Sequence, residues 1–153
     1  MMYKIKFTVA PFSIKAISTL ASALDCFIEI ERDLVMGELR AHTSKRSAVN
    51  QELVDRFDTV FSMLDFSDFV NRYLAGVERG SLNLNSMFVD GEKLLAVLRS
   101  QRDIHMDMLP DTIASENAED VEIAASSLVH LTSLIGAVSD WVEQAKLPQE
   151  TAS

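Results

Sequence analysis

The sequence contains few of the residues that cross-link or interrupt a chain. Among its 153 residues there are five glycines, three prolines and one cysteine, Cys26. A single cysteine excludes a disulfide within the chain and any metal site made of several cysteines. Together with 48% hydrophobic residues, so little glycine and proline is typical of a folded chain that buries a core. A chain of this length needs neither a metal nor a disulfide to fold.

Motifs that bind metals or phosphates are also lacking. The histidines are His42, His105 and His130, and none has a glutamate three residues before it, the spacing that di-metal sites in bundles use. There is no His-Glu-x-x-His motif, and the five glycines lie too far apart to form a phosphate-binding loop. We therefore expect no metal site, no cofactor and no nucleotide site.

The sequence has no long hydrophobic run. No apolar stretch reaches the 18 residues that a membrane-spanning helix requires, so we predict no span and no membrane partner. Lys4 and Lys6 precede an apolar stretch, and "ASA" at 21–23 resembles a leader cleavage site. Lys15 interrupts that stretch, and the pattern after it has a helical period. We therefore expect a cytoplasmic protein, which the single cysteine also suits.

Positive charge is scarce, and the shortage grows toward the C-terminus. The chain carries 14 Lys and Arg against 23 Asp and Glu, a net charge of −9. Residues 1–50 hold seven positive and five negative groups, whereas residues 51–153 hold seven positive and 18 negative. Such a surface repels nucleic acid and anionic lipid and suits a basic protein partner, so a nucleic-acid partner is not expected. The alternative is that the charge serves solubility alone.

Apolar and polar residues alternate at the N-terminus, in "MYKIKFTVAP". The apolar residues on one side are Tyr3, Ile5, Phe7 and Val9. This is the pattern of a half-buried strand, which Pro11 ends. Because a strand needs a partner for its backbone hydrogen bonds, we expect it to pair with residues 81–89, with a second subunit or with another protein.

Long stretches with a helical period fill the rest of the chain. A first helix follows Ser13, a suitable N-cap, and a second begins near Ser47 or Asn50, with "LDFSDF" at 64–69 as a candidate break. A third helix begins after the capping residue Asp90.

The third and fourth helices are expected to be separated by a polar connection. The third fades near Met108, before Pro110, and residues 109–118 form the connection. The fourth runs from about Ser115 to Lys146.

Four amphipathic helices predict an all-α fold, a four-helix bundle of long helices with a short N-terminal strand beside it. Helices of about 30 residues are about 45 Å long, which is long for one compact bundle and favours a dimer or an open groove. We expect one helical domain over residues 1–147 and a mobile tail at 148–153.

The polar segment "AHTSKRS" at 41–47 resembles the motif of histidine phosphotransfer domains, which are acidic four-helix proteins. His42 and Lys45 match the phosphorylated histidine of that family and the lysine three residues after it. Arg46 stands where the family has a small residue that leaves room for a receiver domain. The resemblance implies phosphotransfer through His42; the alternative is a polar turn at 42–47 whose histidine suits a helix C-terminus.

Arg99 and His105 match a second pattern, an arginine followed four to six residues later by a histidine. In "LRSQRDIHMDML", at 98–109, this spacing resembles the motif of HEPN domains, helical bundles of which many are metal-independent ribonucleases that join two motifs at a dimer interface. The resemblance implies His105 as the acid/base and Arg99 as the phosphate contact. On a regular helix these two lie roughly 120° apart, whereas Arg102 is a neighbour of His105.

Two hypotheses of function follow. The first is a non-catalytic, regulatory interaction protein (an adaptor, inhibitor or chaperone-like accessory protein) that works through an acidic helical surface and forms a homodimer or another homo-oligomer. The second is a HEPN-like ribonuclease that uses Arg99, Arg102 and His105 at a dimer interface. We favour the first because the sequence holds no strong catalytic constellation, and we assign no catalytic residue. The second requires His105 and an arginine to open into one groove.

Overall fold

The structure is a computed structural model that describes residues 4–45, 51–80 and 86–147. Within these residues lie a two-stranded sheet and four helices. In chain order they are β1 (Lys4–Thr8), α1 (Ile14–Lys45), α2 (Gln51–Arg79), β2 (Ser86–Asp90), α3 (Gly91–Ala114) and α4 (Ala118–Lys146). The all-α fold with four helices and a short N-terminal strand is confirmed. The tail expected at 148–153 lies outside the described residues.

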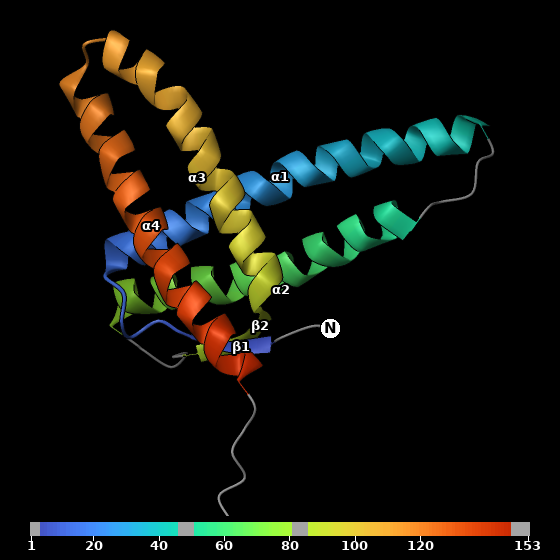
Figure 1. Cartoon of the computed structure of the whole chain (residues 1–153), viewed down its shortest axis with the longest axis horizontal. Coiled ribbons are helices and arrows are strands. Elements are labelled where there is room, and N and C mark those ends of the chain that lie inside the picture. Colours follow the sequence, from blue (N-terminus) through green and yellow to red (C-terminus); the bar gives the residue numbers. More distant parts are fainter. Residues whose placement is uncertain (1–3, 46–50, 81–85, 148–153) are drawn as a thin grey trace, which may run out of the picture.

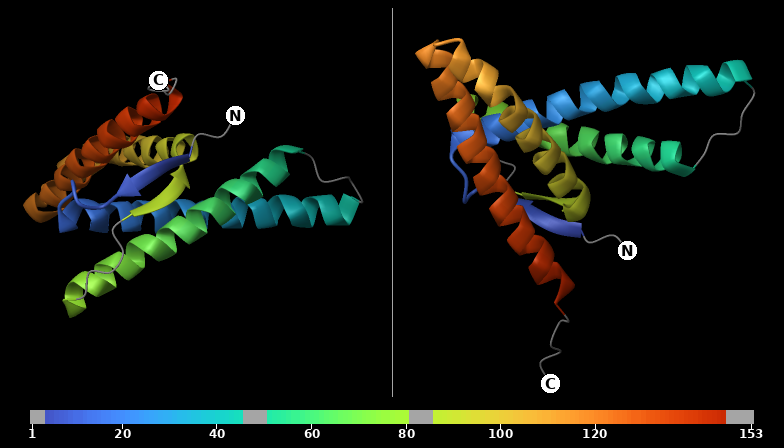
Figure 2. Two further views of the ribbon diagram at one scale, coloured as in Figure 1. Left: turned by 90° about the horizontal axis from the view of Figure 1, so that it is seen from below. Right: turned by 45° about the horizontal axis from the view of Figure 1, so that its top comes forward.

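The helices form two antiparallel pairs that cross each other. α1 packs along α2, and α3 packs along α4. The second pair crosses the first over the N-terminal half of α1 (Figure 1). Beyond the crossing both pairs continue, so their far ends point in different directions (Figure 2). The four-helix fold is therefore built from two crossed hairpins, each of which extends past the region where they meet.

The predicted pairing of the N-terminal strand is confirmed, and it lies within the chain. β1 and β2 are antiparallel, with Ile5 opposite Val89 and Phe7 opposite Met87. Ile5 and Phe7 are buried while Lys4 and the lysine between them are exposed, as the alternation predicts. The ribbon packs against α4 on the β1 side and against α2 on the β2 side, so it connects the two helix pairs.

Phe7 occupies the centre of the core. Its ring, which is fully buried, lies 5.0 Å from the ring of Phe66 on α2 and 5.5 Å from the ring of Trp141 on α4. A third ring, that of Phe12 in the segment before α1, stacks on Phe7 at 5.5 Å. Edge-to-face and offset contacts of this kind contribute about 0.5–1.5 kcal/mol each beyond the area that they bury. One side chain therefore joins the ribbon to both hairpins.

The buried core ends well before the far ends of α3 and α4. The last buried residue of α3 is Gln101, and the first buried residue of α4 is Leu131. Between them, residues 102–130 include none that is buried. We call this segment the α3–α4 arm. The two helices of the arm contact each other and extend away from the crossing (Figure 1). Among their exposed apolar side chains are Met106, Met108, Ile113 and Ile123.

The predicted end of the third helix was wrong. α3 continues through Pro110 to Ala114 instead of fading near Met108. A proline inside a helix removes one backbone hydrogen bond, but here α3 packs against α4 and the Thr112 hydroxyl donates to the Met108 carbonyl at 3.1 Å. The connection is therefore short, and α4 begins after Asn117, whose side chain caps the helix.

Two other expected interruptions are helical in the structure. α1 does not end at the predicted turn at 42–47 but extends to Lys45. α2 is continuous through 64–69. There, Phe66 and Phe69 are both buried and their rings stack at 6.1 Å, so packing keeps the segment helical despite its capping residues. The side chain of His42 lies outside the described residues.

α4 is long and apolar enough to cross a membrane, judged by length and composition alone, although no span was predicted from the sequence. Its most apolar window of 18 residues has a mean hydropathy of 1.6, and 22% of that window is buried. Core helices of soluble proteins meet the same criterion. In this fold α4 packs along α3 and also contacts α1 and β1. Much of its apolar surface nevertheless lies outside the core.

The junction between β2 and α3 leaves no room for an added side chain. Asp90 caps α3 by accepting a hydrogen bond from the Lys93 amide at 3.1 Å. At the next residue, Gly91, a Cβ atom would lie 2.5 Å from Cγ2 of Val142 and 2.9 Å from Cγ2 of Ile5. Both neighbours are buried, β-branched side chains that cannot easily turn away. A glycine is therefore required for α3 to approach α4 and β1 here.

We expect Gly91→Ala to lower the free energy of unfolding by about 1–3 kcal/mol, because the added methyl overpacks this junction. Gly37→Ala and Gly136→Ala are matched controls, since each lies inside a helix with no atom within 4 Å of the added Cβ. These should raise the free energy of unfolding by up to about 1 kcal/mol. Urea unfolding followed by circular dichroism measures all three. A Gly91→Ala protein as stable as the controls would contradict the close packing.

Candidate functional site

A groove runs along the α3–α4 arm to the point where the arm meets α1. It consists of an outer hollow between α3 and α4 and an inner hollow that α1 also lines. His105, Met108 and Ser127 line both hollows, so the two are continuous, and each has a volume of about 420 Å³. We call them together the arm groove.

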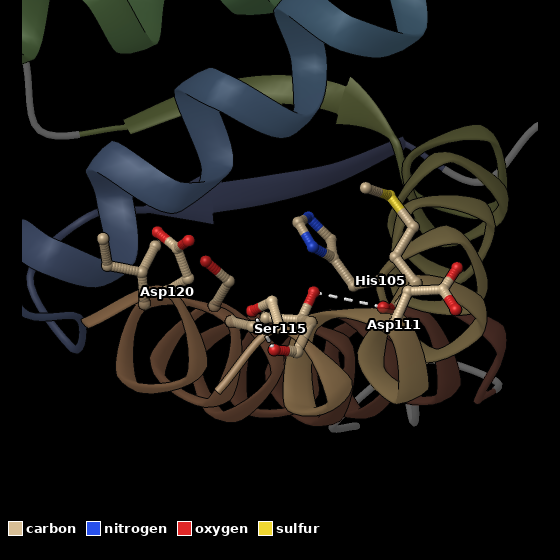
Figure 3. A pocket seen from close by; sticks show the side chains of 9 residues that line it. His105, Asp111, Ser115 and Asp120 are labelled. Atoms are coloured by element: carbon tan, nitrogen blue, oxygen red, sulfur yellow. Dashed lines mark hydrogen bonds between the residues drawn. The ribbon is translucent and has the colours of Figure 1, made fainter. Parts of the chain in front are cut away.

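The outer hollow combines exposed apolar side chains with carboxylates. Met108 and Ile123 line it, and each is 58% exposed. His105 points into the hollow from α3, with Asp111 and Asp120 at its two sides (Figure 3). Exposed apolar residues that gather around a hollow are typical of a binding surface rather than of an ordinary solvated face. The polar groups at its sides give that surface a negative charge.

The whole arm is acidic. Between residues 103 and 122 there are seven carboxylates and no Lys or Arg. These are Asp103, Asp107, Asp111, Glu116, Glu119, Asp120 and Glu122. Glu119 and Asp120 occupy the first turn of α4, where a helix favours negative charge. Of the seven, Asp111 and Asp120 line the groove, and the other carboxylates add to the negative field of the arm, which attracts cations.

The inner hollow lies where the arm leaves the core. Two buried residues form its floor, Gln101 at 3% exposure and Leu131 at 0%. The side chains that α1 contributes are small: Ser18, Thr19, Ser22, Ala23 and Cys26. Small residues on α1 leave space between it and the arm, because no long side chain fills the angle at which the helices cross. The inner hollow is therefore a direct consequence of the crossing.

Arg99 does not share this groove. It lines a separate hollow on the other side of α3, together with Glu92, Ser139 and Lys146. There the Lys146 Nζ lies 2.9 Å from a carboxylate oxygen of Glu92. This hydrogen bond, together with the attraction of opposite charges, lowers the pKa of the Glu92 carboxyl. The structure therefore places Arg99 beside an ion pair rather than beside His105.

The other candidate residues, Arg102 and His130, do not line the arm groove. Arg102 is half-buried on α3 and lines neither hollow of the arm groove. His130 is half-buried on α4 and is likewise outside the groove lining. Within a single chain, only His105 of the three ribonuclease candidates opens into the groove. Among the described residues, no group of three or more His, Cys, Asp or Glu could hold a metal ion.

Several groove residues were not singled out in the sequence. Met108 looked like the end of a helix, and Gln101, Ile123 and Ser127 carried no motif. A signal was present nonetheless: Met108, which is exposed, is an apolar residue between Asp107 and Asp111 on the charged side of the helix. Apolar residues outside the core stripe of an amphipathic helix are a sign of a second contact surface.

We expect no specific ribonuclease activity from the chain, because Arg99 and His105 open on different hollows and the acidic arm repels RNA phosphates. Incubation of wild type, His105→Ala and Arg99→Ala with a single-stranded RNA oligonucleotide should give the same background cleavage on a gel. His130→Ala serves as a matched histidine control. Cleavage that His105→Ala and Arg99→Ala abolish but His130→Ala preserves would instead support the ribonuclease hypothesis.

Comparison with known proteins identifies no relative. The chain matches no protein-family model, no curated protein and no solved structure. Its function is therefore inferred from the chemistry of the arm groove.

Proposed function

We propose that this chain is a non-catalytic protein-interaction module that binds a basic amphipathic helix of a partner protein in the arm groove. The observation that carries the proposal is the combination of exposed apolar side chains at the groove with carboxylates along the same arm. Neither property alone is unusual for a soluble protein. Together they match the apolar and basic sides of one helix.

The apolar part of the groove suits helix-in-groove recognition. In that mode a partner helix places apolar side chains, spaced three and four residues apart, into a hydrophobic groove. Met108 and Ile123 supply the outer part of the surface and the half-buried Ile104 the inner part. Methionine is unbranched and adapts its shape to different apolar partners. The groove can therefore receive a row of side chains rather than a single one.

The length of the groove also suits a helix. Its lining extends from Gln101 on α3 to Ser115, the C-cap of that helix, which is about 21 Å at 1.5 Å per residue. A partner helix of about 14 residues, or four turns, spans this distance. A helix of that size is marginal in water by itself. We therefore infer a partner segment that becomes helical, or is held helical by its own protein, when it binds.

The carboxylates determine which helix the groove favours. Asp111 and Asp120 lie at the sides of the outer hollow, where Lys or Arg residues flanking the apolar face of a partner would reach them. Exposed ion pairs of this kind contribute little affinity each. The carboxylates raise the association rate of a basic partner. They also disfavour an acidic partner, because its binding would bring like charges together. The proposed module is therefore selective for basic helices in a salt-dependent way.

The test uses a designed peptide probe of about 16 residues, with Leu at i, i+3, i+4 and i+7 spacing, Lys at the flanking positions and Ala elsewhere. A second peptide carries Glu in place of each Lys. We expect wild type to bind the Lys peptide at least about tenfold more tightly than the Glu peptide, measured by fluorescence anisotropy at low salt. No binding of the Lys peptide would overturn the proposal.

Matched variants show whether the peptide occupies the groove. Met108→Asp should weaken binding by about tenfold or more, whereas Met36→Asp, at a methionine that is 43% exposed on α1, should not. The double variant Asp111→Lys/Asp120→Lys should bind the Lys peptide more weakly than the double variant Asp58→Lys/Asp65→Lys. The second variant changes the net charge by the same amount, but on α2. An equal loss of affinity in the two double variants would show that the peptide is attracted by the overall charge of the protein, and would contradict a site in the groove.

A further inference from the structure

Gln101 is a buried polar residue whose side chain makes no hydrogen bond within the described part of the chain. Three polar or charged residues are buried in the described part of the chain: Ser67, Asp90 and Gln101. Ser67 bonds to Asp25, and Asp90 accepts the amide hydrogen bond that caps α3. The Gln101 side chain, in a residue only 3% exposed, makes no hydrogen bond with any residue that the structure describes. Buried polar groups normally have partners, so this amide requires an explanation.

The amide of Gln101 reaches the inner hollow of the arm groove. Among the described residues, no side-chain nitrogen or oxygen that is sealed from solvent lacks a hydrogen-bond partner. Because the Gln101 amide makes no hydrogen bond to a described residue, its polar atoms are not sealed, and the residue lines the inner hollow, where solvent reaches them. The same hollow is lined by apolar side chains, among them Ala23 and Ile104, and by the hydroxyls of Ser22 and Ser127. Water satisfies the amide while the groove is open, and an apolar ligand that filled the groove would leave it unpaired.

We propose that Gln101 is the specificity-determining residue of the arm groove and pairs with a carboxamide side chain, Asn or Gln, on the apolar face of the bound helix. This inference rests on the proposed function. A carboxamide offers a donor and an acceptor in one plane, so two such groups can form two hydrogen bonds at once. A single buried Asn at an otherwise apolar helix interface is a known means of selecting one register.

Other polar side chains fit this position less well. A carboxylate can only accept, and the acidic arm repels it. An ammonium group can only donate, so it would satisfy the oxygen of Gln101 and leave the amide nitrogen unpaired. The inner hollow, at about 420 Å³, has room for a side chain that extends to its floor. The groove therefore favours a neutral group with both hydrogen-bonding functions, placed among the partner's apolar residues.

The test replaces each of the four Leu residues of the Lys peptide by Gln in turn, which scans the unknown register. We expect three of these peptides to bind wild type more weakly than the parent, and one to bind about tenfold more tightly. This preference should reverse with Gln101→Leu, which pairs best with the all-Leu parent. Gln144→Leu, at an exposed glutamine on α4 outside the groove, should leave the preference unchanged.

The outcomes separate this inference from the proposed function. Suppose that every Gln peptide binds more weakly than the all-Leu parent, and by the same factor in wild type and in Gln101→Leu. If the parent peptide still binds in the groove, the role of Gln101 is overturned while the helix-binding site stands. If no Lys peptide binds, both are overturned. The peptide scan on wild type needs no folded variant. Gln101→Met, which is closer in shape to glutamine, replaces Gln101→Leu if circular dichroism shows that the leucine variant is unfolded.

Discussion

The contact between the Phe7 ring and the rings of Phe66 and Trp141 holds the two helix hairpins together. It lies at the crossing, and the buried residues of all four helices gather around it. A β-strand is an effective way to place such a ring, because alternation directs Phe7 inward while its neighbours remain in water. The position of β1 between α4 and the strand that borders α2 therefore determines where the hairpins meet.

A core concentrated at one crossing leaves long helices with little to cover them. Beyond Gln101 and Leu131 the α3–α4 arm has no buried residue, and at the other end of the molecule α1 and α2 also expose large apolar side chains. A parallel bundle of the same helices would have covered those faces. The crossed arrangement instead exposes them, which explains how a chain with 48% hydrophobic residues has apolar surface available for a partner.

The motif in the stretch "LRSQRDIHMDML" lies at the groove on α3, but its arginine and histidine do not form one site. Its spacing drew attention to the part of α3 where the groove lies, yet the residues that formed the motif are separated: Arg99 faces Lys146 and Glu92, while His105 faces α4 and α1. Helical periodicity predicts that separation. It does not predict the groove, because more than half of the lining comes from the other helices, α1 and α4.

The sequence by itself determined the helices, the strand, the caps at Ser13 and Asp90 and the acidic charge of the arm, because periodicity, capping chemistry and charge are local properties. Only the tertiary structure decided that α3 continues through Pro110 and that α2 is unbroken, since packing against neighbouring elements outweighs local signals there. It also decided the angle of the hairpins. That angle opens the groove and leaves Gln101 without a hydrogen-bond partner among the described residues, so the candidate site depends on contacts that no local pattern records.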